Sequence, residues 1–254
     1  MWQEINGNWV LIPRRRIGVI HFLGGAFVGT APHLTYRLLL ENVSLQGYVV
    51  IATPFINTFD HIEIARSVYN SFETTLEQLQ TTGTISRSSL PIYGIGHSMG
   101  CKLHLLIGSL YPVERAGNIL ISFNNFAARD AVPLVEQFSG AVSLEFSPSP
   151  QDTIKMVDRK YQVRRNLLIR FTNDNLDQSL ALTELLQKRF PGMAVAQTLK
   201  GSHLTPIGQD LNWQVRDIFT PLDAIAQWMK QEVQRDLNQL QKEIIRWLNP
   251  VASF

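Results

Sequence analysis

The sequence predicts an α/β fold, in which a mostly parallel sheet is covered by helices on both faces. Short apolar runs, typical of buried strands, alternate with longer stretches whose apolar residues recur every three or four positions. A Gly-x-Ser-x-Gly motif joins one such strand to the helix that follows it. Strands and helices that alternate in this way are joined by right-handed crossovers, which place the strands parallel to one another.

The composition excludes several other classes of protein. Of the 254 residues, 45% are hydrophobic and 17% are charged, so the chain can build a large core and is not disordered. The single cysteine, Cys101, excludes a disulfide framework and a cysteine-rich zinc site. The 23 basic and 21 acidic residues give a net charge of +2, which offers no electrostatic reason to expect nucleic-acid binding.

The sequence shows no signal for a membrane span or for export. No apolar run approaches the roughly 18 residues that a transmembrane helix needs. Residues 1–16 lack the basic-then-apolar order of a signal peptide. We therefore expect a soluble, cytoplasmic protein without a transmembrane segment.

The first element is expected to be a hairpin at an antiparallel edge of the sheet. Residues 2–5 and 8–12 are strand-like, and Asn6-Gly7 between them suits a two-residue type I′ turn. Further strands are predicted where short apolar runs occur, at residues 17–22, 48–52, 90–95, 118–123, 167–171 and 194–199.

Helices are predicted between these strands. Pro32 favours the first position of one helix, and Asp60 is a suitable N-cap for the next. Apolar residues with helical spacing place the helices after Asp60 at residues 62–79, 98–110 and 179–190.

One segment departs from the alternation of strands and helices. Residues 127–165 contain scattered prolines and no strong strand, which is more chain than a loop between two strands needs. We expect this segment to be a cap inserted into a core made of residues 1–126 and 166–254; a second small domain is the alternative. Its apolar residues would line an acyl pocket or pack the cap onto the core: Val132, Leu134, Val135, Phe138, Val142, Leu144 and Phe146.

The chain ends with a long amphipathic helix. It is expected to begin at Pro221 and to end before Asn249-Pro250. About 27 residues correspond to roughly 40 Å, which is longer than the strands need for cover. Two interpretations remain: a helix that covers the sheet, or a contact for self-association or for a membrane surface through residues 237–248.

The strongest functional signal is the motif Gly96-His97-Ser98-Met99-Gly100, which lies between an apolar strand and a helix. In such an elbow the serine sits on a sharp, strained turn that exposes its hydroxyl. Glycine is needed two positions to either side, because larger side chains would collide with the turn. The sequence therefore predicts that Ser98 is a nucleophile.

A serine nucleophile needs a base, and the chain offers six histidines: His21, His33, His61, His97, His104 and His203. In this architecture the base comes from the loop after the last strand, where only His203 lies. His97 is next to Ser98 and should point away from it. We expect His97, His104 and His21 to be structural.

The base in turn needs a carboxylate to fix its tautomer, in the chain order serine, acid, histidine. Two candidates, Asp174 and Asp177, follow the predicted strand at 167–171. Asp174 has the usual offset from the strand, so we favour it, and Asp177 is the alternative acid. The other position for an acid, after residues 118–123, carries Asn124-Asn125 instead.

The remaining part of the site is an oxyanion hole, in which backbone N–H groups bind the developing negative charge. One donor should be the N–H of Met99. The other should be the N–H of Leu23 or Gly24, in the glycine-rich loop after the strand at 17–22. An alternative role for these glycines is to allow close packing.

Together, residues 21–29, 59–61 and 96–102 resemble the α/β-hydrolase superfamily over nearly the whole chain. They are similar to a branch found in cyanobacteria and plastids that is named only as a domain of unknown function. The resemblance implies an eight-strand sheet with a cap between strands six and seven. It brings no established substrate.

These residues predict a serine hydrolase that acts on the ester or thioester of a small acyl substrate through Ser98, His203 and Asp174, with no metal or organic cofactor. Two alternatives remain open. One is an acyltransferase that uses the same three residues. The other is a non-catalytic hydrolase scaffold that binds a partner through its C-terminal helix, although scaffolds of this kind tend to lose a member of the triad.

Overall fold

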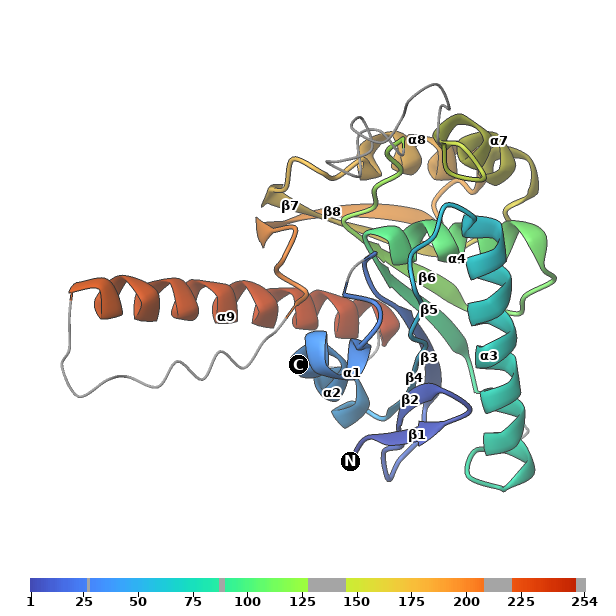
Figure 1. The fold of residues 1–254 in the computed structure, drawn as a ribbon, viewed down its shortest axis with the longest axis horizontal. Coiled ribbons are helices and arrows are strands. Elements are labelled where there is room, and N and C mark those ends of the chain that lie inside the picture. The colour runs from blue at the N-terminus through green and yellow to red at the C-terminus, as the bar shows by residue number, and fades with distance from the viewer. Residues whose placement is uncertain (27, 87–89, 128–144, 208–220, 250–254) are drawn as a thin grey trace.

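An eight-stranded sheet with helices on both faces forms the centre of the computed structural model (Figure 1). The structure describes residues 1–26, 28–86, 90–127, 145–207 and 221–249, with the backbone alone at 221–233. The strands are β1 (Gln3–Ile5), β2 (Asn8–Leu11), β3 (Gly18–Leu23), β4 (Tyr48–Ala52), β5 (Ile92–His97), β6 (Gly117–Ile121), β7 (Asn166–Asn173) and β8 (Ala194–Ser202). The helices are α1 (Pro32–Thr35), α2 (Arg37–Leu45), α3 (His61–Thr81), α4 (Met99–Leu110), α7 (Pro150–Lys160), α8 (Ser179–Arg189) and α9 (Pro221–Leu248).

The strand order across the sheet is β1-β2-β4-β3-β5-β6-β7-β8. Strands β1 and β2 form an antiparallel hairpin, β2 pairs antiparallel with β4, and the pairs from β4 to β8 are parallel. Asn6 and Gly7 have φ angles of 50° and 75°, as a type I′ turn requires. The predicted edge hairpin and the mostly parallel eight-strand sheet are therefore confirmed.

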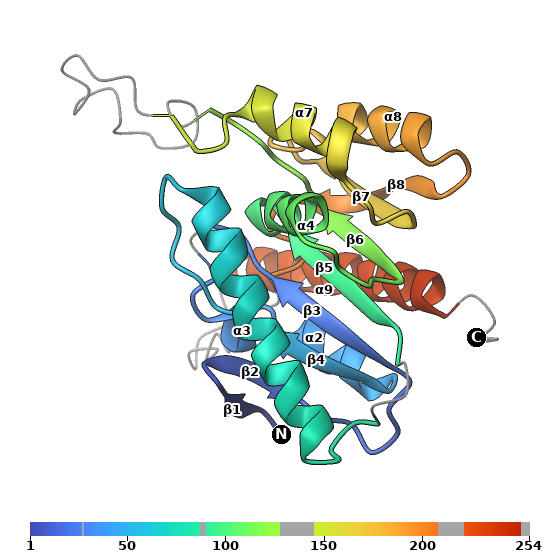
Figure 2. The ribbon, with the colours of Figure 1, turned by 90° about the vertical axis from the view of Figure 1, so that its right-hand side faces the viewer.

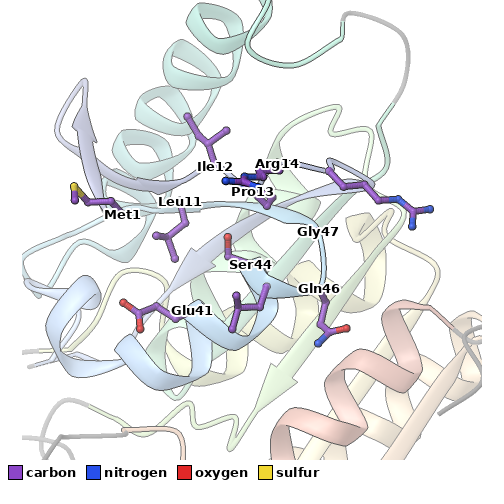
Figure 3. Close-up of a pocket in the computed structure, with 11 residues that line it drawn as sticks. Met1, Leu11, Ile12, Pro13, Arg14, Glu41, Ser44, Gln46 and Gly47 are labelled. Atoms are coloured by element: carbon purple, nitrogen blue, oxygen red, sulfur yellow. The ribbon is translucent and has the colours of Figure 1, made fainter.

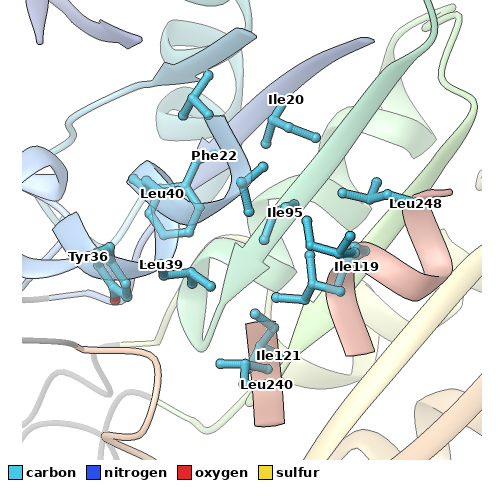
Figure 4. Packing of buried hydrophobic residues seen from close by; sticks show 14 of the residues in the cluster. Ile20, Phe22, Tyr36, Leu39, Leu40, Ile95, Ile119, Ile121, Leu240 and Leu248 are labelled. Atoms are coloured by element: carbon cyan, nitrogen blue, oxygen red, sulfur yellow. The ribbon is translucent and has the colours of Figure 1, made fainter. Parts of the chain in front are cut away.

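The central strands are buried on both faces because each face is covered by helices. In β3, Ile20 and Phe22 pack in the cluster that includes residues of α2 and α9 (Figure 4). Val19 and Leu23 of the same strand face α3 and α4, which Figure 2 shows on the other side of the sheet from α9. This explains why the strands read as continuous apolar runs rather than as alternating ones.

Helix α7 lies within the segment 127–165 that was expected to form a cap, but it packs against α4 and α8. Its Val157 shares a buried cluster with Leu105 of α4 and Leu182 of α8. The helix therefore belongs to the layer of helices that covers the α4 face of the sheet, and its apolar side is buried in that layer. Residues 128–144 lie outside the described residues, so a cap remains a prediction for that part, which holds Val132, Leu134, Val135, Phe138, Val142 and Leu144.

The C-terminal part of α9 covers the sheet next to α2. Its apolar residues are buried against the strands: Leu237, Leu240, Ile244, Ile245 and Leu248. Gln241 donates a hydrogen bond of 3.0 Å to the carbonyl of Leu38 in α2. The stripe at 237–248, expected as a contact for self-association or a membrane, is thus already occupied within this chain. Self-association through another surface remains a proposal.

None of the helices in the described ranges has the length and apolar character that crossing a membrane would require. Helix α9, with 28 residues, is long enough to cross a membrane. Its sequence carries charged residues along the whole length, such as Asp223, Lys230 and Glu243.

Candidate active site

Ser98 occupies the turn between β5 and α4. Its φ and ψ angles are 55° and −118°, a strained conformation that non-glycine residues rarely adopt and that costs on the order of 1–3 kcal/mol. A Cβ atom on Gly96 would lie 2.7 Å from the carbonyl group of Gly100, and one on Gly100 would collide with the carbonyl oxygen of Leu23. Steric exclusion therefore explains both glycines of the motif, and the predicted elbow is present.

The hydroxyl of Ser98 has a partner that sequence reasoning missed. Asn124, which follows β6, donates a hydrogen bond of 2.8 Å from Nδ2 to Ser98 Oγ. The sequence analysis considered Asn124 only as a position that lacks an acid. A polar residue just beyond the carboxyl end of a neighbouring strand was the signal that could have found it.

Asp174 and His203 are in contact. His203 Nδ1 lies 2.9 Å from Asp174 Oδ2. Asp174 follows β7 and His203 follows β8, and these two strands pair in parallel, so their ends bring the side chains together. Because a carboxylate only accepts, His203 donates through Nδ1 and its Nε2 stays free to act as a base.

The carboxylate of Asp174 is held in its charged form. Its side chain is fully buried, and burial raises the pKa. The hydrogen bonds from His203 and from the backbone N–H of Leu176 act in the opposite direction and hold the pKa below its usual value. Asp174 is therefore ionised at neutral pH.

Asp177, the alternative acid, has other partners. Its Oδ2 accepts a hydrogen bond of 2.7 Å from Arg170 Nε, and its Oδ1 accepts one of 2.5 Å from Ser179 Oγ. The backbone N–H of Ser179, the first residue of α8, also points to Oδ1, at 3.3 Å. Asp177 thus bonds to the first residue of α8 and to Arg170, and among the described residues it has no hydrogen bond to His203.

Ser98 and His203 line one cavity of about 290 Å³. Within the described part of the chain no direct hydrogen bond joins their side chains, and Ser98 Oγ accepts its hydrogen bond from Asn124. The other walls are mostly apolar: Gly25, Ala26, Val28, Asn57, His97, Met99, Asn124, Phe126, Leu176, Leu204 and Ile207. The cavity therefore suits an apolar group held next to the serine.

A chain of buried hydrogen bonds connects the glycine-rich loop to the histidine loop. The N–H of Gly25 donates to the hydroxyl of Tyr36 at 2.8 Å, and this hydroxyl donates to His97 Nδ1 at 2.8 Å. His97 Nε2 then donates to the carbonyl of His203 at 2.9 Å. Burial lowers the pKa of His97 to about 3, so the ring is neutral, and one tautomer satisfies all three bonds. His97 lines the same cavity as Ser98, and its bond to the carbonyl of His203 supports the loop of that histidine.

Of the three predicted oxyanion donors, only one lines the cavity at Ser98. Met99 lies at the first turn of α4 and lines the cavity. Leu23 and Gly24 do not line it; Leu23 is fully buried against residues of α3 and α4. The loop reaches the cavity at Gly25 and Ala26, and the N–H of Gly25 is already bonded to Tyr36. Ala26 and Val28 are the other residues of this loop that line the cavity.

His21 and His104 lie in the packing between the sheet and α3 and α4. His104 Nε2 donates to the carbonyl of Ile95 at 3.1 Å, and Arg115 donates to His21 Nδ1 at 2.8 Å. Burial lowers the pKa of both rings well below the usual value, so they are neutral. The described residues contain no cluster of three or more His, Cys, Asp or Glu side chains that could hold a metal ion.

A wider hollow of about 770 Å³ lies elsewhere (Figure 3). Its walls include Arg14 and Gly47, which precede β3 and β4. It is therefore at the amino ends of the parallel strands, whereas Ser98, Asp174 and His203 follow the carboxyl ends. In open α/β sheets ligands bind beyond the carboxyl ends, which favours the smaller cavity as the site.

The fold is similar to those of several hydrolases. A soluble variant of monoglyceride lipase from Saccharomyces cerevisiae, in complex with a substrate analogue, has a TM-score of 0.61 at 13% identity, covering 100% of this chain and 96% of that one. FphF, a fluorophosphonate-binding serine hydrolase of Staphylococcus aureus, has a TM-score of 0.56 at 13% identity, covering 93% and 96%. Carboxyl esterase 2 from Tuber melanosporum has a TM-score of 0.55 at 16% identity, covering 93% and 87%.

At these identities the similarity concerns the fold, and it confirms the α/β-hydrolase fold that the sequence resemblance implies. None of the curated proteins compared with this chain matches it. A family model does match, over residues 1–250, and its description is "Protein of unknown function (DUF1350)". Since this match spans nearly the whole sequence, the chain belongs to the DUF1350 family and has the α/β-hydrolase fold.

Proposed function

We propose that the protein is a serine hydrolase that cleaves a carboxylic ester or thioester through Ser98, His203 and Asp174. The 2.9 Å contact between Asp174 and His203, in a loop that shares a cavity with Ser98, carries the proposal. The neighbours in fold include a lipase, an esterase and a serine hydrolase, which supports a hydrolase. The fold alone does not define an activity, so the site must provide the argument.

In the proposed reaction Ser98 Oγ bonds to the carbonyl carbon of the substrate while His203 Nε2 takes the hydroxyl proton. The C–O or C–S bond then breaks, and His203 returns the proton to the departing alcohol or thiol. Water attacks the acyl-serine, gives a proton to His203 and releases the carboxylic acid, and the proton goes back to Ser98. Asp174 stays ionised and stabilises the imidazolium at both stages.

Asn124 orients the nucleophile in this mechanism. Because its Nδ2 donates to Ser98 Oγ, the hydroxyl proton of Ser98 is not used in that bond and remains available for His203. The N–H of Met99, at the start of α4, is one oxyanion donor, favoured by the positive end of the helix dipole. We assign the second donor to the N–H of Ala26.

A profile with esters of graded acyl length tests the activity and its product. The cavity of about 290 Å³ lies at the low end of ligand-pocket volumes, so short acyl esters should give the highest kcat/KM. Free acid should be the product with or without an added alcohol. A new ester formed in the presence of the alcohol would indicate an acyltransferase, and inertness on every ester would favour a non-catalytic scaffold.

Tyr36→Phe should lower kcat about tenfold or more and change KM little. The substitution leaves Gly25 N–H and His97 Nδ1 without a partner, at a cost of about 1–3 kcal/mol for each buried group. Tyr161→Phe is a matched control, because Tyr161 is also buried and hydrogen-bonded, to Asn118 and Asn166, but lies outside the site. Both variants should lose thermal stability. Equal kcat in the two would show that Tyr36 does not position the loops.

A further inference from the structure

A second, smaller pocket adjoins the cavity at Ser98. It has a volume of about 50 Å³, enough for a small polar group. Met99, Asn124 and Phe126 line both spaces, so the two pockets are direct neighbours. Several of the residues around this pocket carry buried polar side chains that the proposed mechanism does not use.

Lys102, one helical turn after Ser98 on α4, provides a positive charge in this pocket. Its side chain is 2% exposed, and its Nζ donates one hydrogen bond of 3.1 Å to the carbonyl of Pro148. Burial lowers its pKa to about 8, and the carboxylate of Glu145 acts in the opposite direction, so the ammonium is mostly charged at pH 7. An ammonium has three N–H donors, and the carbonyl of Pro148 is neutral. A buried ammonium with donors to spare favours an anionic ligand, because burying a charge is costly unless it is paired and hydrogen-bonded, and the nearby Glu145 and the Phe146 ring, 5.6 Å from Nζ, offset only part of this cost.

His61, the first residue of α3, also lines this pocket, and both of its ring nitrogens are unpaired. Its side chain is 3% exposed, and within the described residues neither Nδ1 nor Nε2 has a hydrogen-bond partner. The ring stacks on Phe146 with 4.3 Å between centroids, which fixes its direction. Burial and the nearby charge of Lys102 lower its pKa to about 3, so it is neutral and offers one N–H donor and one acceptor.

Two amide oxygens complete the cluster. Asn57 Oδ1 and Asn125 Oδ1 are buried and, within the described residues, have no partner. Asn125 is fixed by a hydrogen bond of 2.9 Å from its Nδ2 to the carbonyl of Pro150. Most buried polar atoms in proteins are hydrogen-bonded, so four unpaired atoms around one small pocket indicate that a polar group binds there.

We propose that this pocket binds a carboxylate of the substrate, and that the enzyme therefore prefers esters whose acyl part ends in a carboxylate, such as the monoesters of short dicarboxylic acids. Lys102 pairs with the carboxylate, and the N–H of His61 donates to it. The two amide oxygens accept hydrogen bonds from water that accompanies the group. The selectivity rests on the proposed hydrolase function, whereas the binding of a carboxylate does not.

Monoethyl glutarate and ethyl pentanoate test the selectivity, because they differ only by a carboxylate in place of a terminal methyl group. Wild-type protein should show the higher kcat/KM with monoethyl glutarate. In Lys102→Met the ratio of the two kcat/KM values should fall about 10–100-fold, the size expected for a hydrogen bond to a charged group. Lys160→Met, which removes an exposed lysine of α7 and changes the net charge equally, should leave the ratio unchanged. Equal ratios in wild type and Lys102→Met would overturn the proposal.

Binding of glutarate, measured by calorimetry, separates this inference from the hydrolase proposal. Wild-type protein and Lys160→Met should bind glutarate, and Lys102→Met should bind it at least tenfold more weakly, whether or not any ester is cleaved. His61→Phe keeps the stacking on Phe146 and removes both nitrogens, so it provides a second test should Lys102→Met not fold. A wild-type protein that hydrolyses esters but binds no glutarate would show that the pocket holds only water.

Discussion

Asp174→Asn is expected to lower kcat about 10⁴-fold while the protein stays folded. The expectation follows from the 2.9 Å bond between Asp174 and His203 Nδ1. An amide in place of the carboxylate favours the wrong tautomer of the histidine and no longer stabilises the imidazolium, and this change costs about 10⁴ in serine proteases with the same arrangement. Hydrolysis of a short acyl ester at saturating concentration is the measurement.

Asp177→Asn is the matched control for this variant. It makes the same change three residues away, at a carboxylate that pairs with Arg170 and accepts from the N–H of Ser179. Asp177 and Arg170 form an ion pair in which the aspartate side chain is 1% exposed, so the variant should melt at a lower temperature and keep most of its kcat. The opposite ranking of the two variants would move the acid of the triad to Asp177.

Ser98→Ala is expected to lower kcat about 10⁶-fold, the loss that follows when a serine protease loses its nucleophile. No other hydroxyl of the described site combines the elbow geometry with a place in the cavity of His203. Ser109→Ala is the control, because Ser109 lies on α4, the helix that follows Ser98, and bonds to the carbonyl of Leu105 within that helix. Full activity in Ser98→Ala would show that another residue is the nucleophile.

Local signals allowed much of the site to be predicted from the sequence. The elbow at Ser98 is specified by a steric requirement at Gly96 and Gly100, which a five-residue motif expresses directly. Asp174 and His203 were placed by chain order and by their offset from two predicted strands. Adjacent parallel strands bring their carboxyl ends together, so these offsets were enough to predict the contact.

Contacts between distant segments could not be predicted in the same way. Asn124 and Ser98 meet because β6 lies beside β5, and Tyr36 reaches His97 from the junction between α1 and α2. The second oxyanion donor depends on how the glycine-rich loop bends, and the residues of this loop that line the cavity are Gly25, Ala26 and Val28 rather than Leu23 or Gly24. No periodicity or motif in the sequence carries this information.

Helix α9 and the segment 127–165 show a related limit of prediction from the sequence. The apolar stripe of α9 has the same helical spacing whether it covers the sheet or binds a partner, and only the packing of residues such as Leu240 and Ile244 distinguishes the two. Helix α7 lies in a segment whose length favoured a cap, yet its Val157 packs with α4 and α8. An amphipathic pattern predicts that a face is buried but not which surface buries it.

Labelling with a fluorophosphonate, followed by mass spectrometry of the peptides, tests the proposed triad most directly. This reagent reacts with a serine that a neighbouring base activates, and it needs no knowledge of the substrate. The expected result is a single adduct on Ser98 of the wild-type protein, with no adduct in Ser98→Ala or in folded His203→Ala. Folded wild-type protein that remains unlabelled, or that carries its adduct on another residue, would contradict the assignment of Ser98 as the nucleophile.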